Sequence, residues 1–362
     1  MKNIIILVLS ITIFSYQSYS QGCVAIKSNG ANFMLTHPEE IKGNKGGWQF
    51  NSSVRYFKSF RHFSGTEENK ERLKLGTEVI NHQSSLNLSL TRFFNDRWSL
   101  MIDVPVLANA RSSLYEHGRK ERHSMHSFGV GDVRLAVYNW LLDPVKNHKG
   151  NIQVGLGIKL PTGDYDYKDY WYNVGPNGTK ELRTVDQSIQ LGDGGTGFTT
   201  EINAFYHVRR NIAIYGNFYY LINPREQNGV RTYRELVSAT LANEAISSVP
   251  DQYMGRAGIS YFFNHIKGLG VAAGARLEGI PVYDIIGGSD DFRRPGYIWS
   301  VEPTVTYAIR NLNLFASVPF AVKRNRTQSV TDKANSIIRA RHVQGDAAFA
   351  DYSINAGFTI KF

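Results

Sequence analysis

The chain ends in DYSINAGFTIKF, residues 351–362, a stretch that alternates between apolar and polar side chains. Its apolar set consists of Tyr352, Ile354, Ala356, Phe358, Ile360 and Phe362. The residues between them are polar or glycine, so a β-strand here has one apolar face and one polar face. A soluble sandwich contains such strands as well. The number and spacing of the alternating segments must therefore decide the fold.

Alternation of this kind recurs along the whole chain. It predicts twelve strands, at 47–60, 80–92, 97–107, 127–141, 151–162, 197–208, 211–222, 253–263, 269–280, 297–309, 311–323 and 346–362. Each is about ten residues or longer, which is enough to cross a bilayer when the strand is tilted. Five of the outgoing strands are expected to end at a proline, because proline cannot donate to a strand ladder. These prolines are Pro105, Pro161, Pro224, Pro281 and Pro319.

The connections between the predicted strands alternate in length. Short turns alternate with long polar stretches at 61–79, 109–126, 163–196, 223–252, 280–296 and 324–345. An even number of strands, with short turns at one end and long loops at the other, is typical of outer-membrane barrels. We therefore predict an all-β fold, a transmembrane antiparallel up-and-down β-barrel of about 12 strands. Its short turns would be periplasmic and its long loops extracellular.

Composition excludes several other classes of protein. The 362 residues are 42% hydrophobic and 20% charged, which excludes a disordered chain. No apolar run of about 20 residues occurs, so the sequence predicts no transmembrane helix. The single cysteine excludes an intramolecular disulfide scaffold and a cysteine-rich zinc site.

The N-terminus reads as a targeting segment. Residues 1–20 combine Lys2, an apolar stretch and small residues before Gln21, which predicts a Sec signal peptide cleaved at that point. Lipidation at Cys23 is the rival interpretation. We expect 21–46 to form a periplasmic N-terminal segment and 47–362 to form the barrel. The predicted location is the outer membrane of a Gram-negative bacterium.

Charged side chains within the strands are expected to point into the lumen, because an Arg or Lys facing lipid costs about 2–4 kcal/mol at the bilayer midplane. Alternation assigns to the lumen Arg55, Asp103, Asp132, Arg134, Lys159, Glu201, Arg256, Arg276, Glu278, Glu302 and Asp351. These charges either pair and close a narrow lumen, or form a polar constriction that selects solutes. Strand pairing predicts a contact between Arg276 and Glu302, shared with Glu278.

Two further features suggest partners. The terminal aromatic Phe362 resembles the signal read by the barrel-assembly machinery, and it also suits a periplasmic aromatic girdle. Basic loop residues could dock the phosphates of lipopolysaccharide, although an ordinary solvated surface explains them as well. They are Arg111, Arg119, Lys120, Arg122, Lys323, Arg324, Arg326, Lys333, Arg339 and Arg341. No nucleic-acid module is visible.

Motifs for metal binding and catalysis are weak. His117, His123 and His126 lie in one loop, but their spacing is not diagnostic of a metal site. Asp164, Asp166 and Asp169 lack the glycine and the final glutamate of a calcium loop, so a solvated turn explains them better. The sequence contains neither a Gly-x-Ser-x-Gly elbow nor a His-Glu-x-x-His motif. We therefore predict no enzyme, no cofactor and no metal.

Three glycine-rich segments carry a family resemblance. They are FGVGDVR at 128–134, GLGIKLPTG at 155–163 and GDGGTGF at 192–198. They resemble the outer-membrane barrels labelled "putative MetA-pathway of phenol degradation", a transporter-like family. The resemblance covers roughly residues 125–320. It implies a barrel and passage of a small molecule, and it carries over no catalytic residues.

Two functions from different classes follow. The first is a narrow channel or transporter for a small amphipathic or anionic solute. The second is a structural or accessory barrel of a larger outer-membrane complex for secretion, assembly or uptake, with no transport activity of its own. In the second case the long loops and the 21–46 segment would contact other outer-membrane proteins. Conductance in a planar bilayer separates the two.

Overall fold

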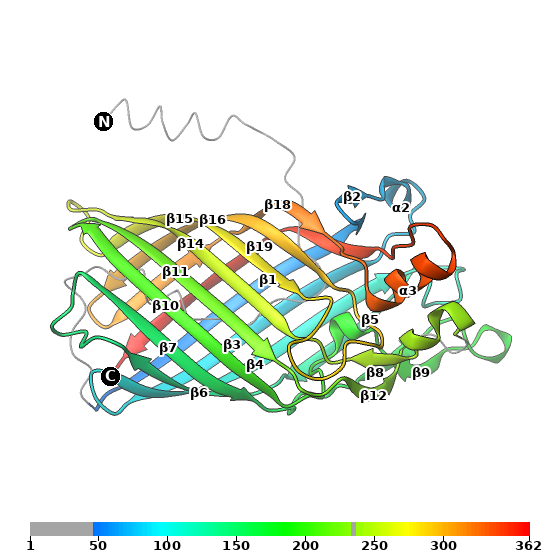
Figure 1. Cartoon of the computed structure of the whole chain (residues 1–362), viewed down its shortest axis with the longest axis horizontal. Helices are drawn as coiled ribbons and strands as arrows, with labels where there is room; N and C mark the ends of the chain where they lie inside the picture. Colours follow the sequence, from blue (N-terminus) through cyan, green and yellow to red (C-terminus); the bar gives the residue numbers. More distant parts are fainter. Residues whose placement is uncertain (1–45, 233–236) are drawn as a thin grey trace.

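A computed structural model describes residues 46–232 and 237–362, which form a closed antiparallel β-barrel (Figure 1). The predictions on residues 1–45, including the signal peptide, cleavage before Gln21 and the fate of Cys23, lie outside the described residues. The barrel closes where the first strand pairs with the last, from Gln49 opposite Lys361 to Phe63 opposite Ala347. The predicted all-β fold is confirmed.

Twelve strands make the barrel wall, as the alternation predicts, and each pairs antiparallel with its neighbours. In order around the barrel they are β1 (Trp48–Ser64), β3 (Ile80–Phe93), β4 (Trp98–Ser113), β5 (His123–Val130) continued by β6 (Arg134–Trp140), β7 (Gly150–Lys159), β10 (Gly197–Arg209), β11 (Ile212–Ile222), β14 (Gln252–Phe262), β15 (Leu269–Ile280), β16 (Gly296–Ile309), β17 (Leu312–Ser317) continued by β18 (Phe320–Asn325), and β19 (Ala347–Lys361).

Two of the twelve wall strands are interrupted, and proline explains both sites. Pro319 separates β17 from β18, where it cannot donate to the ladder. Pro105 was expected to end its strand, but it lies inside β4, opposite Asn87 of β3. Its backbone faces the gap between β5 and β6, where the amide of Gly131 donates to the Pro105 carbonyl (2.8 Å). Pro105 has no N–H to donate. It lies where the adjacent strand is interrupted between β5 and β6, so no strand hydrogen bond is lost there.

Short turns gather at one end of the barrel and long loops at the other, as predicted (Figure 1). The loop end carries secondary structure of its own. It consists of β2 (Glu67–Glu68), α2 (Lys70–Lys74), β8 (Lys168–Trp171), η3 (Pro176–Gly178), β9 (Glu181–Thr184), η4 (Gln187–Ile189), β12 (Gln227–Arg231), η5 (Ala239–Glu244), β13 (Ile246–Ser248) and α3 (Val330–Ile338). Half of the polar stretch 109–126 is strand, because β4 and β5 extend beyond the predicted ends. Among the described residues, no helix combines the length and the apolar character needed to span a membrane.

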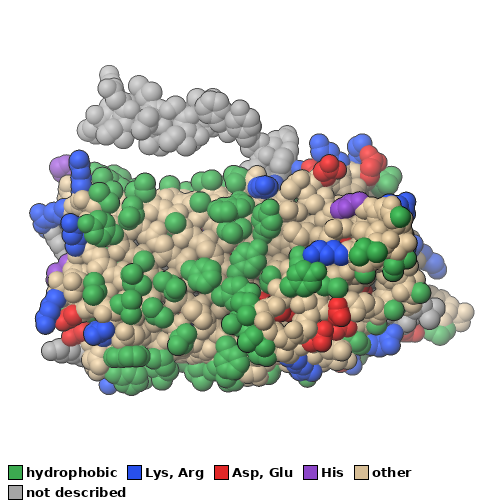
Figure 2. Space-filling view, in the orientation of Figure 1, with side chains coloured by type: hydrophobic (Ala, Val, Ile, Leu, Met, Phe, Trp, Pro, Cys, Tyr) green, Lys and Arg blue, Asp and Glu red, His purple; other side chains and the backbone are tan. Residues whose placement is uncertain are grey.

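The two faces of the barrel wall differ in polarity. Outward-facing side chains are largely apolar, and Figure 2 shows them spread over the wall, with charged side chains gathered toward the ends. Ile354 is 44% exposed on this outer face, whereas the inward Asn87 is 6% exposed. A water-soluble protein would show the opposite arrangement. The outer surface is therefore suited to a hydrocarbon environment.

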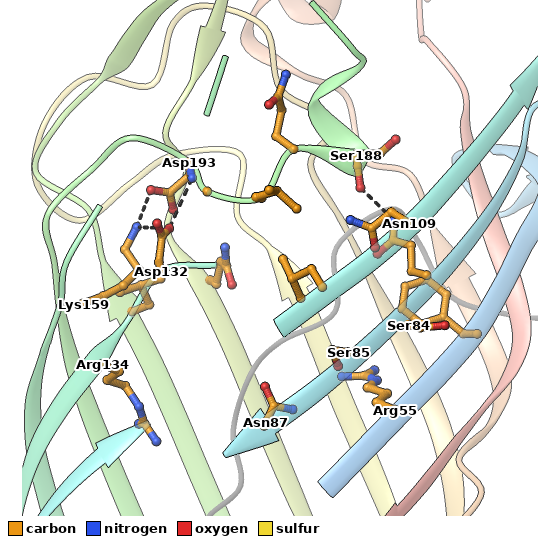
Figure 3. A pocket seen from close by; sticks show the side chains of 18 of the residues that line it. Arg55, Ser84, Ser85, Asn87, Asn109, Asp132, Arg134, Lys159, Ser188 and Asp193 are labelled. Carbon is orange, nitrogen blue, oxygen red and sulfur yellow. Dashed lines mark hydrogen bonds and ion pairs between the residues drawn. The ribbon is translucent and has the colours of Figure 1, made fainter. Parts of the chain in front are cut away.

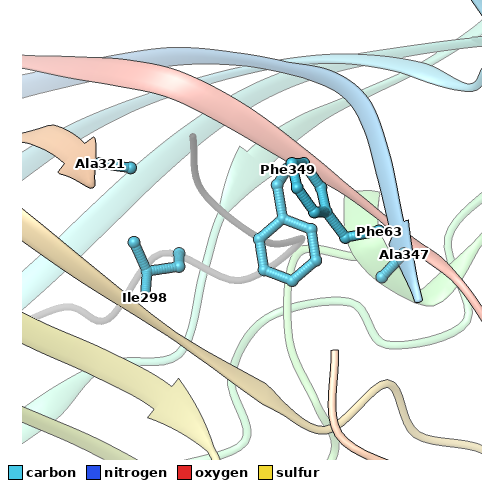
Figure 4. Packing of buried hydrophobic residues seen from close by; sticks show 5 residues of the cluster. All are labelled: Phe63, Ile298, Ala321, Ala347 and Phe349. Carbon is cyan, nitrogen blue, oxygen red and sulfur yellow. The ribbon is translucent and has the colours of Figure 1, made fainter. Parts of the chain in front are cut away.

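Small apolar clusters fix the loop end of the barrel. Phe63, Ile298, Ala321, Ala347 and Phe349 pack together where β1, β16, β18 and β19 approach that end (Figure 4). The rings of Phe63 and Phe349 meet edge to face, with centroids 5.6 Å apart. A second cluster joins Met125 of β5 to Trp171, Val185 and Ile189 of the long loop between β7 and β10. This loop is thereby held against the barrel.

Candidate functional site: the charged barrel interior

The eleven charged residues assigned to the lumen fall into connected groups inside the barrel. Eight of them line one interior cavity: Arg55, Asp103, Asp132, Arg134, Lys159, Arg256, Arg276 and Glu302. The other three form ion pairs with inward side chains, Glu201 with Arg134, Glu278 with Arg55 and Asp351 with Arg61. Most of the eleven are buried. Asp351 is half-buried, and Arg256 is half-buried as a whole residue although its side chain is only 7% exposed.

The cavity itself is partly polar and partly apolar. Its volume is about 210 Å³, whereas one water molecule needs roughly 10–15 Å³. Serine and asparagine side chains line it, and the apolar part of the lining includes Phe57, Leu107, Tyr219, Leu221 and Phe315. Such a space suits a small molecule with both polar and apolar parts.

One chain of ion pairs runs through the cavity. Glu278 accepts from Arg276 (2.8 Å) on its own strand and from Arg55 (3.2 Å) of β1. Glu302 of β16 lies 3.7 Å from Arg276 and 3.3 Å from Arg256 of β14. The contact predicted between Arg276 and Glu302 is therefore present, and Glu278 shares Arg276 as expected. Arg256 extends the group by one member.

A second group surrounds Glu201 of β10. Arg134 donates to Glu201 (3.1 Å), and the hydroxyl of Tyr138 donates to the same oxygen (2.8 Å). The guanidinium of Arg134 also lies 5.5 Å from the ring centre of Tyr219. Both tyrosines are buried and face inward. The lumen residues predicted from the sequence do not include these two tyrosines, because only charged residues were considered, although the alternation of the strands also places them in the lumen.

A third group ties the long loop between β7 and β10 to the wall (Figure 3). The carboxylate of Asp132 accepts from the amides of Gly163 (3.0 Å) and Asp193 (3.2 Å). Lys159 contacts both Asp132 (3.5 Å) and Asp193. A side chain at position 192 would collide with Asp132, because its Cβ would lie 2.6 Å from Oδ1. The three glycine-rich segments of the sequence therefore meet at one point.

The same loop turns into the barrel, and we call residues 186–194 the infolded segment. Gln83 of β3 donates to the carbonyl of Ser188 (2.8 Å), and Ser127 of β5 donates to that of Ile189 (2.5 Å). Gln187, Ser188, Leu191 and Asp193 are among the residues that line the cavity. The infolded segment thus forms the cavity wall on the loop side.

Asp186 anchors the start of the infolded segment. Arg294, from the loop between β15 and β16, donates to its carboxylate (2.7 Å), and Arg111 of β4 lies 3.4 Å away. Burial of Asp186 alone would raise the pKa of its carboxyl, but Arg111 and Arg294 outweigh burial and hold that pKa well below its ordinary value. The carboxylate therefore stays charged and joins two loops to the wall.

Several basic residues expected on loop surfaces lie inside instead. Arg111 is buried and paired with Glu116 (2.7 Å), because β4 runs on to Ser113 and the alternation turns Arg111 inward. Arg324 and Arg326 are buried too, and Arg326 contacts Asp332 (3.1 Å). The residues that stay exposed or half-exposed are Arg119, Lys120, Arg122, Lys323, Lys333, Arg339 and Arg341.

The histidine loop has a structural explanation. His117 is buried, and its Nδ1 accepts from the amide of Tyr172 (3.0 Å). Burial, together with nearby His123, lowers the pKa of His117 to about 4. Within residues 46–232 and 237–362, no group of three His, Cys, Asp or Glu side chains is placed to hold a metal ion. Asp164 accepts from the amide of Asp166 (2.9 Å) in a local turn.

Comparison with solved structures supports the fold. An outer membrane channel from Pseudomonas putida F1 is 11% identical, with a TM-score of 0.56, and the match covers 88% of this chain and 96% of that one. The CymD monoaromatic hydrocarbon channel matches at 9% identity and a TM-score of 0.43, over 96% and 99% of the chains. The β domain of the Bordetella autotransporter BrkA matches at 13% and 0.44, over 88% and 100%.

These comparisons bear on the fold alone. The first structure shares the barrel architecture, and the other two scores are too low to carry any argument. No family model and no curated protein matches the sequence. The resemblance of the three glycine-rich segments to a transporter-like family thus remains a prediction.

Proposed function

We propose that the protein is an outer-membrane channel that passes a small amphipathic or anionic solute. One observation carries the proposal: a closed barrel with an apolar outer face encloses a polar, charged cavity of about 210 Å³. A barrel that served only as a membrane anchor would not require an internal space lined by ionised groups, which are costly to bury. Selective passage gives those groups a role.

The topology suggests how the barrel is oriented in the membrane. The short turns would face the periplasm and the long loops the cell exterior. The infolded segment would then form the outer boundary of the cavity, and the ion pairs around Glu302 would narrow it. Export by a Sec signal peptide and assembly by the barrel-assembly machinery belong to the same proposal. So does contact of the exposed basic loops with lipopolysaccharide.

The experiment is a planar-bilayer measurement on purified, refolded protein. The proposal predicts a stable single-channel conductance, and it predicts that small solutes swell liposomes containing the protein. A folded barrel that inserts and remains electrically silent, and that passes no solute, would overturn it. Heat-modifiable migration on a gel provides the check that the barrel is folded.

A second candidate function is an accessory barrel in a larger outer-membrane complex. Exposed apolar side chains at the loop end favour it: Ile285 and Ile286 lie between β15 and β16, and Ile337 and Ile338 lie at the end of α3. Isolated exposed apolar residues are common, but large ones gathered on loops suit contact with another protein. Copurification of one stoichiometric outer-membrane partner with a silent barrel would favour this function over a channel.

A further inference from the structure

Two arginines face each other directly inside the barrel. Arg256 of β14 is the register partner of Arg276 of β15. Their side chains are only 7% and 5% exposed. Like charges that are directly opposite each other destabilise a sheet, and buried charges require compensation. Negative charge close to the two arginines is therefore needed to compensate their buried positive charges.

The carboxylates of the described chain supply this charge incompletely. Glu302 serves both arginines through a single oxygen, Oε1, at 3.3 Å from Arg256 and 3.7 Å from Arg276. Glu278 serves Arg276 but is also bound by Arg55. Arg256 therefore has one shared carboxylate oxygen within ion-pair distance, and the other oxygen of Glu302, Oε2, is buried without a hydrogen-bond partner.

Donor atoms of both arginines remain unused. Nε and Nη2 of Arg256 and Nε of Arg276 are buried, and they donate no hydrogen bond to any described residue. A buried guanidinium N–H without an acceptor is costly, so such groups usually have a partner. Arg256 and Arg276 both line the interior cavity. The unused donors thus belong to two residues that line the cavity, although the donor atoms themselves are shielded from solvent.

The same cavity offers an apolar surface beside the arginines. Phe315, Tyr219, Leu221 and Ile280 contribute to its lining. A ligand that satisfies this arrangement carries one compact anionic group and an apolar body. A carboxylate is a compact anion whose geometry a guanidinium matches with two parallel hydrogen bonds.

We propose that Arg256 and Arg276 form a binding subsite for the carboxylate of a small organic acid with an apolar body. The inference rests on the proposed channel function and refines it, since it names the class of solute. The carboxylate would accept from the unused donors, and the apolar body would lie against the aromatic and aliphatic part of the cavity. Arg256 is the principal residue because two of its three nitrogens lack an acceptor.

Benzoate is a suitable probe, and neutral benzamide has nearly the same shape. Equilibrium dialysis would measure benzoate binding to the folded protein in detergent micelles, and proteoliposomes would measure the flux of both compounds. The variants are Arg256→Gln and the charge-balanced double variant Arg256→Gln/Glu302→Gln. Lys146→Gln is the control, because it removes one positive charge from a turn residue whose side chain is 81% exposed.

We expect the wild type and Lys146→Gln to bind benzoate alike. Both Arg256 variants should bind it roughly tenfold more weakly or worse, because charge-assisted hydrogen bonds are lost. Benzamide flux should persist in all four proteins. If the folded wild type fails to bind benzoate, or if Arg256→Gln binds it unchanged, the subsite is wrong even where flux continues. If binding depends on Arg256 but neither compound crosses faster than it does in protein-free liposomes, the subsite stands and the channel function falls.

Discussion

Arg55 of β1 and Glu278 of β15 meet across the barrel interior, with Nη2 and Oε1 3.2 Å apart. Along the shorter way round the wall, three strands separate them: β16, the β17–β18 strand and β19. The ion pair therefore spans the lumen instead of running along the wall. Because Glu278 also binds Arg276, the crossing pair is continuous with the group around Glu302. The width of the lumen at this height depends on charge pairing.

Removing one charge from this group should therefore be worse than removing a balanced pair. Glu302→Gln leaves Arg256 without its only ion-pair partner among the described residues, and the free energy of unfolding should fall by about 3–5 kcal/mol. The double variant Arg256→Gln/Glu302→Gln should recover most of that loss, because Arg276 keeps Glu278. Urea unfolding in detergent, followed by tryptophan fluorescence, measures both. Equal losses would show that the pairing contributes little.

The two faces of β19 should respond differently to the same substitution. Ile354→Arg places a charge on the apolar outer face and should cost about 2–4 kcal/mol, with reduced membrane assembly. Asn355→Arg places the same charge on the opposite, inward face and should be milder. The measurement is the yield of heat-modifiable barrel in membranes. Similar damage at both positions would mean that the faces are assigned wrongly.

The barrel wall could be predicted because its determinants are local. Alternation in each segment fixes both the strand and its two faces, so the pairing of β15 with β16 follows from their sequences and from their position as consecutive wall strands joined by one loop. The prediction that Arg276 contacts Glu302 needed only that register. The predicted strand ends were wrong where an adjacent strand determines how far a strand extends. Pro105 lies in mid-strand because the adjacent strand is interrupted beside it.

The infolded segment could not be predicted, because its contacts join residues far apart in the sequence. Asp186 meets Arg294 and Arg111, and Gly192 matters because Asp132 lies against it. No periodicity marks such contacts. The glycine-rich segments at 128–134, 155–163 and 192–198 were the available signal, but only the structure shows that they converge. Arg111 was placed on a loop because no local rule indicates how far β4 extends.

Stability of the loop around His117 should depend on pH. The imidazole has a pKa of about 4 in the folded protein and about 6.5 when exposed. Between pH 4 and pH 6.5, His117 therefore binds a proton in the unfolded chain but not in the folded chain. Stability should be complete above pH 6.5 and should decrease as the pH falls toward 4.

His117→Asn is the matched variant for this effect. It keeps a side-chain acceptor for the amide of Tyr172 but cannot titrate. The wild type should lose about 2 kcal/mol more than the variant between pH 7 and pH 4.5. Hydrogen exchange of the Tyr172 amide reports the local stability. Identical pH profiles would contradict the assignment.

Deletion of Phe362 should slow assembly more than it weakens the finished barrel. The backbone of Phe362 pairs with Trp48 through two hydrogen bonds (2.7 and 2.9 Å), but its side chain is largely exposed. Its loss therefore removes little packing. Pulse-chase assembly in cells measures the rate, and thermal unfolding of the purified barrel measures stability. An unchanged assembly rate would remove the basis for an assembly signal.

The infolded segment should limit the flow of solute through the barrel. Asp186 should hold this segment in place. Its carboxylate joins Arg294 of one loop and Arg111 of the wall, and it also caps η4 by accepting from the amide of Ser188 (3.0 Å). Asp186→Asn removes the charge but keeps an oxygen for the cap. It removes the carboxylate that Arg294 and Arg111 share, although Arg111 keeps its ion pair with Glu116, and breaking a buried ion pair in this way costs about 3–5 kcal/mol.

A loss of that size exceeds what a few neutral hydrogen bonds to β3 and β5 can offset, at about 1 kcal/mol each. The segment should therefore leave the lumen for part of the time, and mean single-channel conductance should rise at least twofold. Asp166→Asn is the control on the same loop, because Asp166 pairs with Lys168 at an exposed position. If conductance in Asp186→Asn equals that of the control while protease cleavage within 186–194 increases, the segment moves without limiting flow. The constriction would then belong to the ion pairs around Glu302.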